Sequence, residues 1–215
     1  LIVYSITVED TASFWDAGEF IAVSSKLEVP HPPGAPFYLL LGRFFSMFAF
    51  GVPENIAIAI NFLSVVSSAF TILFLFWTIT YLASKIIDPR LNNNNKVLVI
   101  LAGFIGSLSF TFTDSFWFSA VESEVYAMSS FFTAFVFWAI LKWESLDDEK
   151  DQNKWIILIA YMMGLSIGVH LLNLVTIPAL ALIIYFKKFK EVTFRGVVIS
   201  LFLGLISVGL IVEGI

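Results

Sequence analysis

The sequence predicts an all-α, polytopic transmembrane helical bundle, and three observations support this fold class. Hydrophobic residues make up 59% of the 215 residues and charged residues only 13%, whereas a soluble domain carries about 25% charged residues. Phe occurs 24 times, which suits surfaces that face lipid or other helices. Long stretches contain no Asp, Glu, Lys or Arg, and roughly 20 apolar residues suffice for a helix to cross the hydrocarbon core.

The uncharged stretches predict the helices in chain order. The chain opens in the apolar run LIVYSI, which we interpret as the outer end of a partial first span over 1–8, and it also stops abruptly, so we expect a fragment of a larger protein. Further spans are expected at 55–84, 97–113, 125–141, 155–169, 171–186 and 196–212. The helices 155–169 and 171–186 come from one uncharged run that is interrupted near its middle by Gly168, His170 and Asn173, so we expect them to meet at an outer turn.

The apolar stretch 37–50, which contains Arg43, decides the orientation of every later helix. If it crosses the membrane, the Lys-rich loops face outward; if it lies in the membrane surface as an interfacial helix, they face inward. The second alternative satisfies the positive-inside rule, because only Lys26 and Arg43 of the 12 basic residues then remain outside. Three segments consequently share the outer side, namely 9–36, 114–124 and 168–173.

The composition and the missing motifs exclude several kinds of site. The chain has no Cys, so disulfides and thiolate metal sites are excluded, and its two His supply few ligands for a transition metal. It has no Walker loop, no dinucleotide-binding glycine motif and no zinc-protease motif. No basic stripe offers a surface to nucleic acid, so membrane lipid is the expected environment. A divalent cation held by the outer acids stays open.

The first outer segment carries Asp16 and Glu19, which are three residues apart and share one face of a helix. Aromatic residues surround them and can raise a carboxyl pKa by lowering the local dielectric. Such a carboxylate can act as a general base toward a hydroxyl acceptor. The alternative is a helix start, because Ser13 and Asp16 have the spacing of a capping box.

The same segment continues with His31-Pro32-Pro33-Gly34. The prolines fix an extended backbone and keep the preceding His31 out of the helical region. This rigidity would hold the His31 side chain in place before the interfacial helix. The alternative is a stiff loop without a chemical role.

The second outer segment, DSFWFSAVESEVYA, carries Asp114, Glu122, Glu124 and Tyr126 at the entry to a span. Acids close to the hydrocarbon are costly unless they face water, a partner or a substrate. Glu122 and Glu124 cannot share a helix face if the helix has already begun, and in that case we expect only one of them to point into a site. The alternative is solvated acids beside a belt of interfacial aromatics.

The turn between the helices 155–169 and 171–186 places His170 and Asn173 three residues apart on one face. Their local surroundings are apolar, which is typical of packing residues. Their expected depth on the outer side, level with the two acidic segments, favours a place in the same site.

Two motifs carry a family resemblance. The run SFWDAGEFIAVSSKLEVPHPPGAPFYLLLGRFFSMFAFG combines W-D-x-G-E-F with H-P-P-G, and ESEVYAMSSFF and GLSIGVHLLNLVTIPALAL extend the likeness over nearly the whole chain. The sequence resembles a bacterial family of protein O-mannosyltransferase-like membrane proteins, common in Bacteroidota and similar to the GT-C glycosyltransferase superfamily. The resemblance implies a GT-C-type bundle whose first outer loop carries an interfacial helix, here 37–50.

The resemblance also implies which residues act. The family's essential acid follows the first spanning helix, which matches Asp16 with Glu19 as its companion. Mannosyltransferases of the superfamily have adjacent Asp and Glu, whereas Ala17 and Gly18 intervene here. The departure leaves open which carboxylate is the base and whether the sugar is mannose.

The implied reaction is an inverting transfer from a polyprenyl-phosphate sugar to a hydroxyl of an exported protein, a glycan or a lipid, at the periplasmic face of a bacterial inner membrane. Asp16 would take the proton of the acceptor hydroxyl. Cationic or hydrogen-bonding groups would meet the leaving phosphate, with Arg43, His31 and His170 as candidates. The other expected substrate-binding residues are Glu122, Glu124, Tyr126 and Asn173.

Two other functions stay open. One is a transporter or channel subunit, which would place ionisable groups near the bilayer midplane; the clustering of acids in outer loops favours surface chemistry instead. The other is a non-catalytic component of a larger membrane complex in the envelope.

Overall fold

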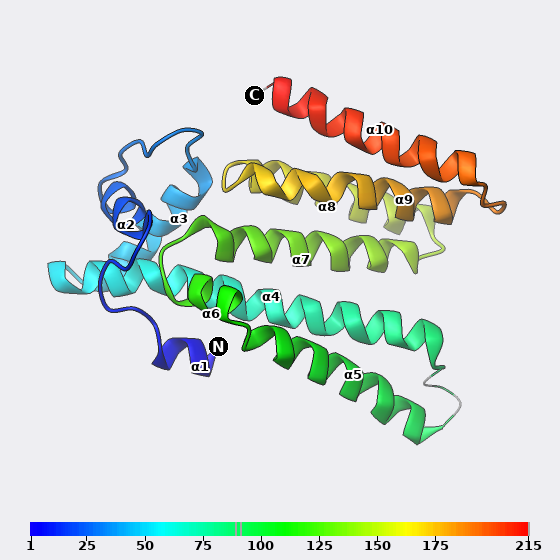
Figure 1. The fold of residues 1–215 in the computed structure, drawn as a ribbon, viewed down its shortest axis with the longest axis horizontal. Helices are drawn as coiled ribbons and strands as arrows, with labels where there is room; N and C mark the ends of the chain where they lie inside the picture. The colour runs from blue at the N-terminus through cyan, green and yellow to red at the C-terminus, as the bar shows by residue number, and fades with distance from the viewer. Residues whose placement is uncertain (89, 91, 215) are drawn as a thin grey trace.

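The computed structural model describes residues 1–88, 90 and 92–214, and this part of the chain is helical without a strand. The all-α class is therefore confirmed (Figure 1). The α-helices are α1 (Ile2–Ile6), α2 (Ala17–Lys26), α3 (Pro36–Ser46), α4 (Ile56–Ile86), α5 (Asn93–Thr111), α6 (Asp114–Val121), α7 (Val125–Glu144), α8 (Glu149–Ile167), α9 (Ile177–Lys188) and α10 (Phe194–Glu213). Three 3₁₀ helices join them, η1 (Met47–Ala49), η2 (Pro53–Asn55) and η3 (Leu171–Thr176).

Five helical stretches of the described chain are long and apolar enough to cross a membrane. They are Pro53–Ile86, Asn93–Thr111, Val125–Glu144, Leu171–Lys188 and Phe194–Glu213. These stretches contain α4, α5, α7, α9 and α10, and η2 and η3 extend two of them at the start. The polytopic membrane bundle expected from the sequence is thus confirmed.

Helix α8 differs from the span expected at 155–169. It begins earlier, at Glu149, and its first turns carry charged side chains. Its apolar part, from Trp155 to Ile167, extends only about 20 Å at 1.5 Å per residue, less than the roughly 30 Å of the hydrocarbon core. With these charged residues in its first turns, α8 is not among the five candidate spans.

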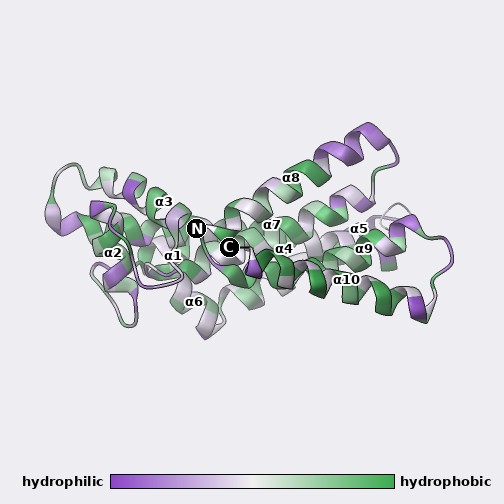
Figure 2. Ribbon diagram, turned by 90° about the horizontal axis from the view of Figure 1, so that it is seen from above, coloured by the Kyte–Doolittle hydropathy of each residue, from purple (hydrophilic) through white to green (hydrophobic). Residues whose placement is uncertain are grey.

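The long helices run alternately in opposite directions, as Figure 1 shows. The segments before α4, between α5 and α7, and between α8 and η3 therefore lie at one end of the bundle, and the connections after α4, α7 and α9 lie at the other. Hydrophobic residues cover the middle of the helices, and hydrophilic residues gather toward the two ends (Figure 2). The three segments expected on the outer side are consequently neighbours in space.

Helices α4 and α7 form the centre of the bundle. Large buried side chains, such as Leu63 of α4 and Phe132 of α7, belong to one hydrophobic cluster, and both helices also bury small hydroxyl side chains, such as Ser68 and Ser129. Small residues let helix backbones approach closely inside a membrane. Because α7 begins directly after Glu124, this central packing fixes the position of the second acidic segment.

The stretch 37–50 forms α3 and η1, and its start is tied to the turn after α8. The backbone N–H groups of Phe37 and Tyr38 donate to the carbonyl of Gly168 at 2.7 and 3.3 Å. The first N–H groups of a helix have no partner within the helix, so this carbonyl satisfies two of them. The contact joins the start of α3, directly after the first outer segment, to the third outer segment.

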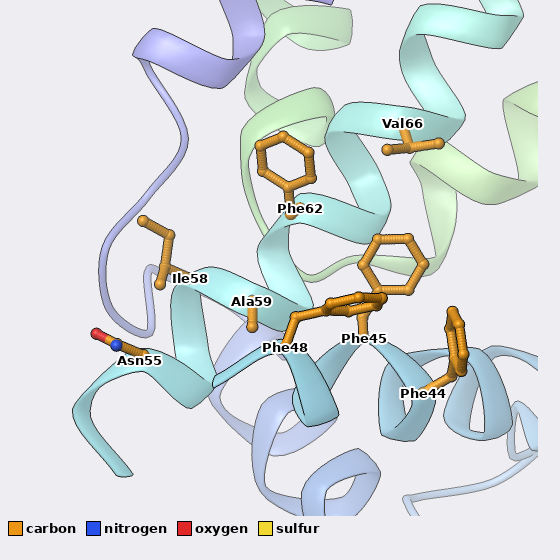
Figure 3. A pocket seen from close by; sticks show the side chains of 8 residues that line it. All are labelled: Phe44, Phe45, Phe48, Asn55, Ile58, Ala59, Phe62 and Val66. Carbon is orange, nitrogen blue, oxygen red and sulfur yellow. The ribbon is translucent and has the colours of Figure 1, made fainter. Parts of the chain in front are cut away.

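A groove of about 690 Å³ lies between α3, η1 and the start of α4 (Figure 3). Three phenylalanines, Phe44, Phe45 and Phe48, line it together with Phe62 and Val66 of α4. None of the described residues around this groove ionises. It offers no acid–base chemistry, and the reactive groups lie elsewhere.

Candidate active site

Asp16 lies at the N-cap position of α2, directly before Ala17. Its side chain makes no capping hydrogen bond, and Ser13 donates its hydroxyl to Glu122 instead of completing a capping box. Asp16 therefore lies where a helix-capping residue would lie, but its carboxylate does not act as a cap. That side chain lines two neighbouring cavities instead.

Glu19 and His31 form a pair across the first outer segment. Glu19 Oε1 accepts the backbone N–H of His31 at 2.7 Å, and Glu19 Oε2 lies 2.9 Å from Nδ1 of the His31 ring. The hydrogen bond from His31 lowers the pKa of Glu19, and the hydrogen bond to Glu19 raises the pKa of His31. Both oxygens of Glu19 are therefore engaged in holding a His31 ring that favours its charged form.

Asp16, Glu19 and His31 could also hold a cation. One ligand atom from each lies within 4.8 Å of the other two. Carboxylate oxygens suit a hard divalent ion, although Glu19 and His31 would have to exchange their mutual hydrogen bond for bonds to the metal.

The second acidic segment corrects one expectation. Glu122 and Glu124 both have extended backbones, since α6 ends at Val121 and α7 begins at Val125. In a strand-like conformation residues two apart lie on the same side, so both carboxyl groups reach the same pocket. The expectation that only one of them points into a site was wrong because it assumed that the helix had already begun.

Both glutamates are buried, with Glu122 2% and Glu124 5% exposed. Burial raises the pKa of Glu122. It raises the pKa of Glu124 to about 7, with further contributions from the charges of Glu122 and Asp16. Glu124 Oε1 accepts the backbone N–H of Asp16 at 3.2 Å, which connects the two acidic segments directly.

These carboxyl groups line a cavity of about 610 Å³, which we call the acidic pocket. Its described lining residues are Trp15, Asp16, Asp114, Ser115, Phe118, Ser119, Glu122, Glu124 and Tyr126. The sequence places Asp114 in the second outer segment but gives it no role, and it does not assign Trp15, Ser115, Phe118 or Ser119 to the site. The i, i+4 spacing of Asp114 with Phe118 and of Ser115 with Ser119 was the available signal for a shared face of α6.

A smaller cavity of about 70 Å³, the histidine cavity, adjoins the acidic pocket. It shares Asp16, Glu124 and Tyr126 with that pocket and adds His31 and His170. The rings of Tyr126 and His170 lie 5.5 Å apart. The structure thus brings together one residue or more from each of the three outer segments.

A third cavity of about 640 Å³, the bundle groove, runs between membrane-spanning helices. Apolar and hydroxyl side chains of α4, α5, α7, η3 and α9 line it, including Leu75, Thr133, Ala134 and Ala179. Tyr126 lines this groove as well as both polar cavities. The tyrosine therefore lies where an apolar space inside the bundle meets the acids.

Two expected substrate-binding residues, Arg43 and Asn173, line none of these three cavities. The Arg43 guanidinium donates to the carbonyl of Ser25 at 2.6 Å, near the C-terminal end of α2, where a positive charge is favourable. Asn173 is 1% exposed. Its side-chain oxygen accepts hydrogen bonds from Ser129 at 3.1 Å and Thr133 at 2.6 Å, so it fastens η3 to α7.

Comparison with known proteins identifies related sequences. The family described as protein O-mannosyl-transferase TMEM260 N-terminal domain matches residues 16–193. Protein O-mannosyl-transferase tmem260 of Dictyostelium discoideum is 32% identical over 136 residues, which cover 62% of this chain and 14% of that protein. Protein O-mannosyl-transferase TMEM260 of Mus musculus is 25% identical over 166 residues, which cover 77% of this chain and 21% of that protein.

No solved structure shows a significant match. The aligned stretches make up 14% and 21% of the two relatives. The family match, in contrast, extends over most of the chain and includes all three outer segments from Asp16 onward. The chain therefore belongs to the family of the protein O-mannosyl-transferase TMEM260 N-terminal domain.

Proposed function

We propose that the chain forms the acidic site of a membrane O-glycosyltransferase that transfers a sugar from a polyprenyl-phosphate donor to a hydroxyl acceptor. One observation carries this proposal: Tyr126 lies at the junction of an apolar groove between spanning helices and two cavities lined by carboxyl groups. A lipid-linked sugar has an apolar tail and a polar head. The groove suits the tail, and the polar cavities suit the head and the acceptor.

In the proposed reaction Asp16 takes the proton of the acceptor hydroxyl. The acceptor oxygen then forms a bond to the anomeric carbon, while the bond from that carbon to the phosphate oxygen breaks and polyprenyl phosphate leaves. His31, which favours its charged form beside Glu19, offers positive charge near the leaving group. Glu124, with a pKa of about 7, holds a proton for much of the time at neutral pH and can donate a hydrogen bond to the sugar.

The names of the two relatives support a protein acceptor, such as Ser or Thr of an exported protein, and mannose as the sugar. The charge distribution of the sequence supports an outward-facing site, which in a bacterial inner membrane is the periplasmic side. A transporter would need ionisable groups near the middle of its spans. The carboxyl groups of the site gather instead at one end of the bundle, which supports chemistry at the membrane surface.

The groove provides the test of the donor class. Ala134→Trp would fill part of the bundle groove, whereas Phe202→Trp on the exposed face of α10 is a matched control. Displacing about two methylene groups of a lipid tail costs about 1.6 kcal/mol, which is about tenfold in affinity. We expect Ala134→Trp to raise KM about tenfold for a long-chain donor and to leave KM for a short-chain donor unchanged. Equal KM values for the long-chain donor in both variants would contradict the proposed donor site.

A further inference from the structure

The turn between α8 and η3 holds His170 in a fixed position. Its anchor is Gly168, whose carbonyl accepts the N–H groups of Phe37 and Tyr38. A Cβ atom at Gly168 would lie 2.8 Å from the Cβ atom of Phe37, so the two backbones meet here at close range. The His170 ring therefore lines the histidine cavity from a turn whose backbone is hydrogen-bonded and closely packed to the start of α3.

One hydrogen bond fixes the tautomer of this ring. The backbone N–H of Leu172 donates to His170 Nδ1 at 3.0 Å. A ring nitrogen can accept only when it carries no proton, so the proton of the neutral ring must be on Nε2. Among the described residues no group is hydrogen-bonded to Nε2, and the ring faces the cavity. His170 thus presents one N–H donor to the cavity and no acceptor.

The surroundings of His170 also favour its uncharged form. Burial lowers the pKa of His170. The ionisable groups that share its cavity are Asp16 and His31 from the first outer segment and Glu124 and Tyr126 from the start of α7. None of these carboxyl groups is hydrogen-bonded to the His170 ring in the described structure. Protonation of Nδ1 would also cost the hydrogen bond from Leu172.

The surroundings of the two histidines of the cavity therefore favour opposite charge states. His31 is exposed and bonded to Glu19, which raises its pKa. His170 is half-buried and bonded to a backbone N–H, which requires a neutral ring. In a site with several carboxyl groups an uncharged donor has an advantage, because it does not form an ion pair with them and stays available to a substrate.

We propose that His170 is a fixed, uncharged hydrogen-bond donor, whose Nε2–H binds a phosphate oxygen of the lipid-linked substrate. This inference rests on the proposed function and assigns His170 a direct contact with the phosphate. The donor is oriented before the substrate arrives, so binding requires no reorientation of the ring.

Two substitutions separate this role from a structural one. In His170→Asn the side-chain oxygen can still accept the N–H of Leu172, and Asn is a favoured capping residue, but nothing replaces Nε2. In His170→Gln the amide N–H₂ can reach the position of Nε2, and the bond to Leu172 is lost. The first variant keeps the turn without the donor, and the second keeps the donor without the cap.

The test is the binding of farnesyl phosphate to the full-length protein in detergent, with farnesol as the uncharged control. We expect His170→Asn to lower the affinity for farnesyl phosphate at least tenfold and His170→Gln to keep that affinity within about threefold of wild type. Farnesol should bind to all three proteins with the same affinity. Melting temperatures would show whether each variant is folded.

Wild-type affinity in His170→Asn would overturn the inference. Equal weakening in both variants, with lower melting temperatures, would also overturn it, because His170 would then only cap the turn. Since this assay measures binding, it stays separate from the proposed function, which would fail if wild-type protein transferred no sugar.

Discussion

Glu124→Gln replaces a carboxyl group that is buried beside two other acids with an uncharged side chain of the same shape. Glu124 is 5% exposed, and its pKa is raised from the ordinary value of 4.5 to about 7 by burial first and by Glu122 and Asp16 second. The amide can keep the contact that Oε1 makes with the N–H of Asp16. We therefore expect the variant to fold.

The effect on stability depends on pH, and its sign follows from the direction of the shift. The folded protein binds this proton more tightly than the unfolded chain, so the free energy of unfolding decreases as the pH rises from about 4.5 to about 7. A pKa raised from 4.5 to about 7 corresponds to about 3 kcal/mol. Below pH 4.5 this penalty is absent, and above pH 7 it is complete.

Thermal unfolding of the purified full-length protein at pH 5 and pH 8 measures this effect. We expect Glu124→Gln to match wild type near pH 5 and to be more stable at pH 8, by up to about 3 kcal/mol. Glu28→Gln, at an exposed position of the first outer segment, should leave the free energy of unfolding unchanged at both pH 5 and pH 8. A Glu124→Gln protein that is less stable than wild type at pH 8 would refute the reasoning, because the ionised carboxylate would then stabilise the fold.

Two further substitutions test the framework around the site. Gly168→Ala should lower the free energy of unfolding by about 1–3 kcal/mol, because its Cβ atom would lie 2.8 Å from that of Phe37. The control Gly164→Ala, with no atom within 4 Å of an added Cβ, should be tolerated. Equal stability of the two variants in thermal unfolding would contradict the close approach at Gly168. Glu19→Gln should lower the pKa of His31, because the hydrogen bond and charge of Glu19 raise it, and an NMR titration of the His31 ring that gives the wild-type value would contradict the pairing.

The fold was largely predictable because hydrocarbon length and charge restrict membrane helices strongly. Uncharged runs identified the long spans, and the basic residues placed three polar segments at one end of the bundle, where the structure also has them. The start of α8 was not predicted because its first turns, from Glu149 to Lys154, are polar and charged. The uncharged run begins only at Trp155. A helix can therefore extend several residues beyond its apolar part, as α8 does at its start.

The site was predictable in outline but not in its contacts. The sequence placed Asp16, Glu124 and His170 on one side of the membrane, and the structure brings them to one cavity. It could not show that Arg43 is bonded to the end of α2, since that contact depends on how α3 packs against α2. Nor could it show the tautomer of His170, which is determined by a backbone hydrogen bond within a turn.

Sugar transfer by the full-length protein is the most direct test of the proposed function. Membranes that contain wild type, Asp16→Asn or the control Asp10→Asn, an exposed residue of the same segment, would be incubated with labelled polyprenyl-phosphate sugars and an extract of exported proteins. We predict transfer by wild type and Asp10→Asn, and a loss of about 100-fold or more in a folded Asp16→Asn protein. Equal transfer by Asp16→Asn and Asp10→Asn would contradict the role of Asp16 as the base, and no transfer by wild type from any donor would contradict the proposed function itself.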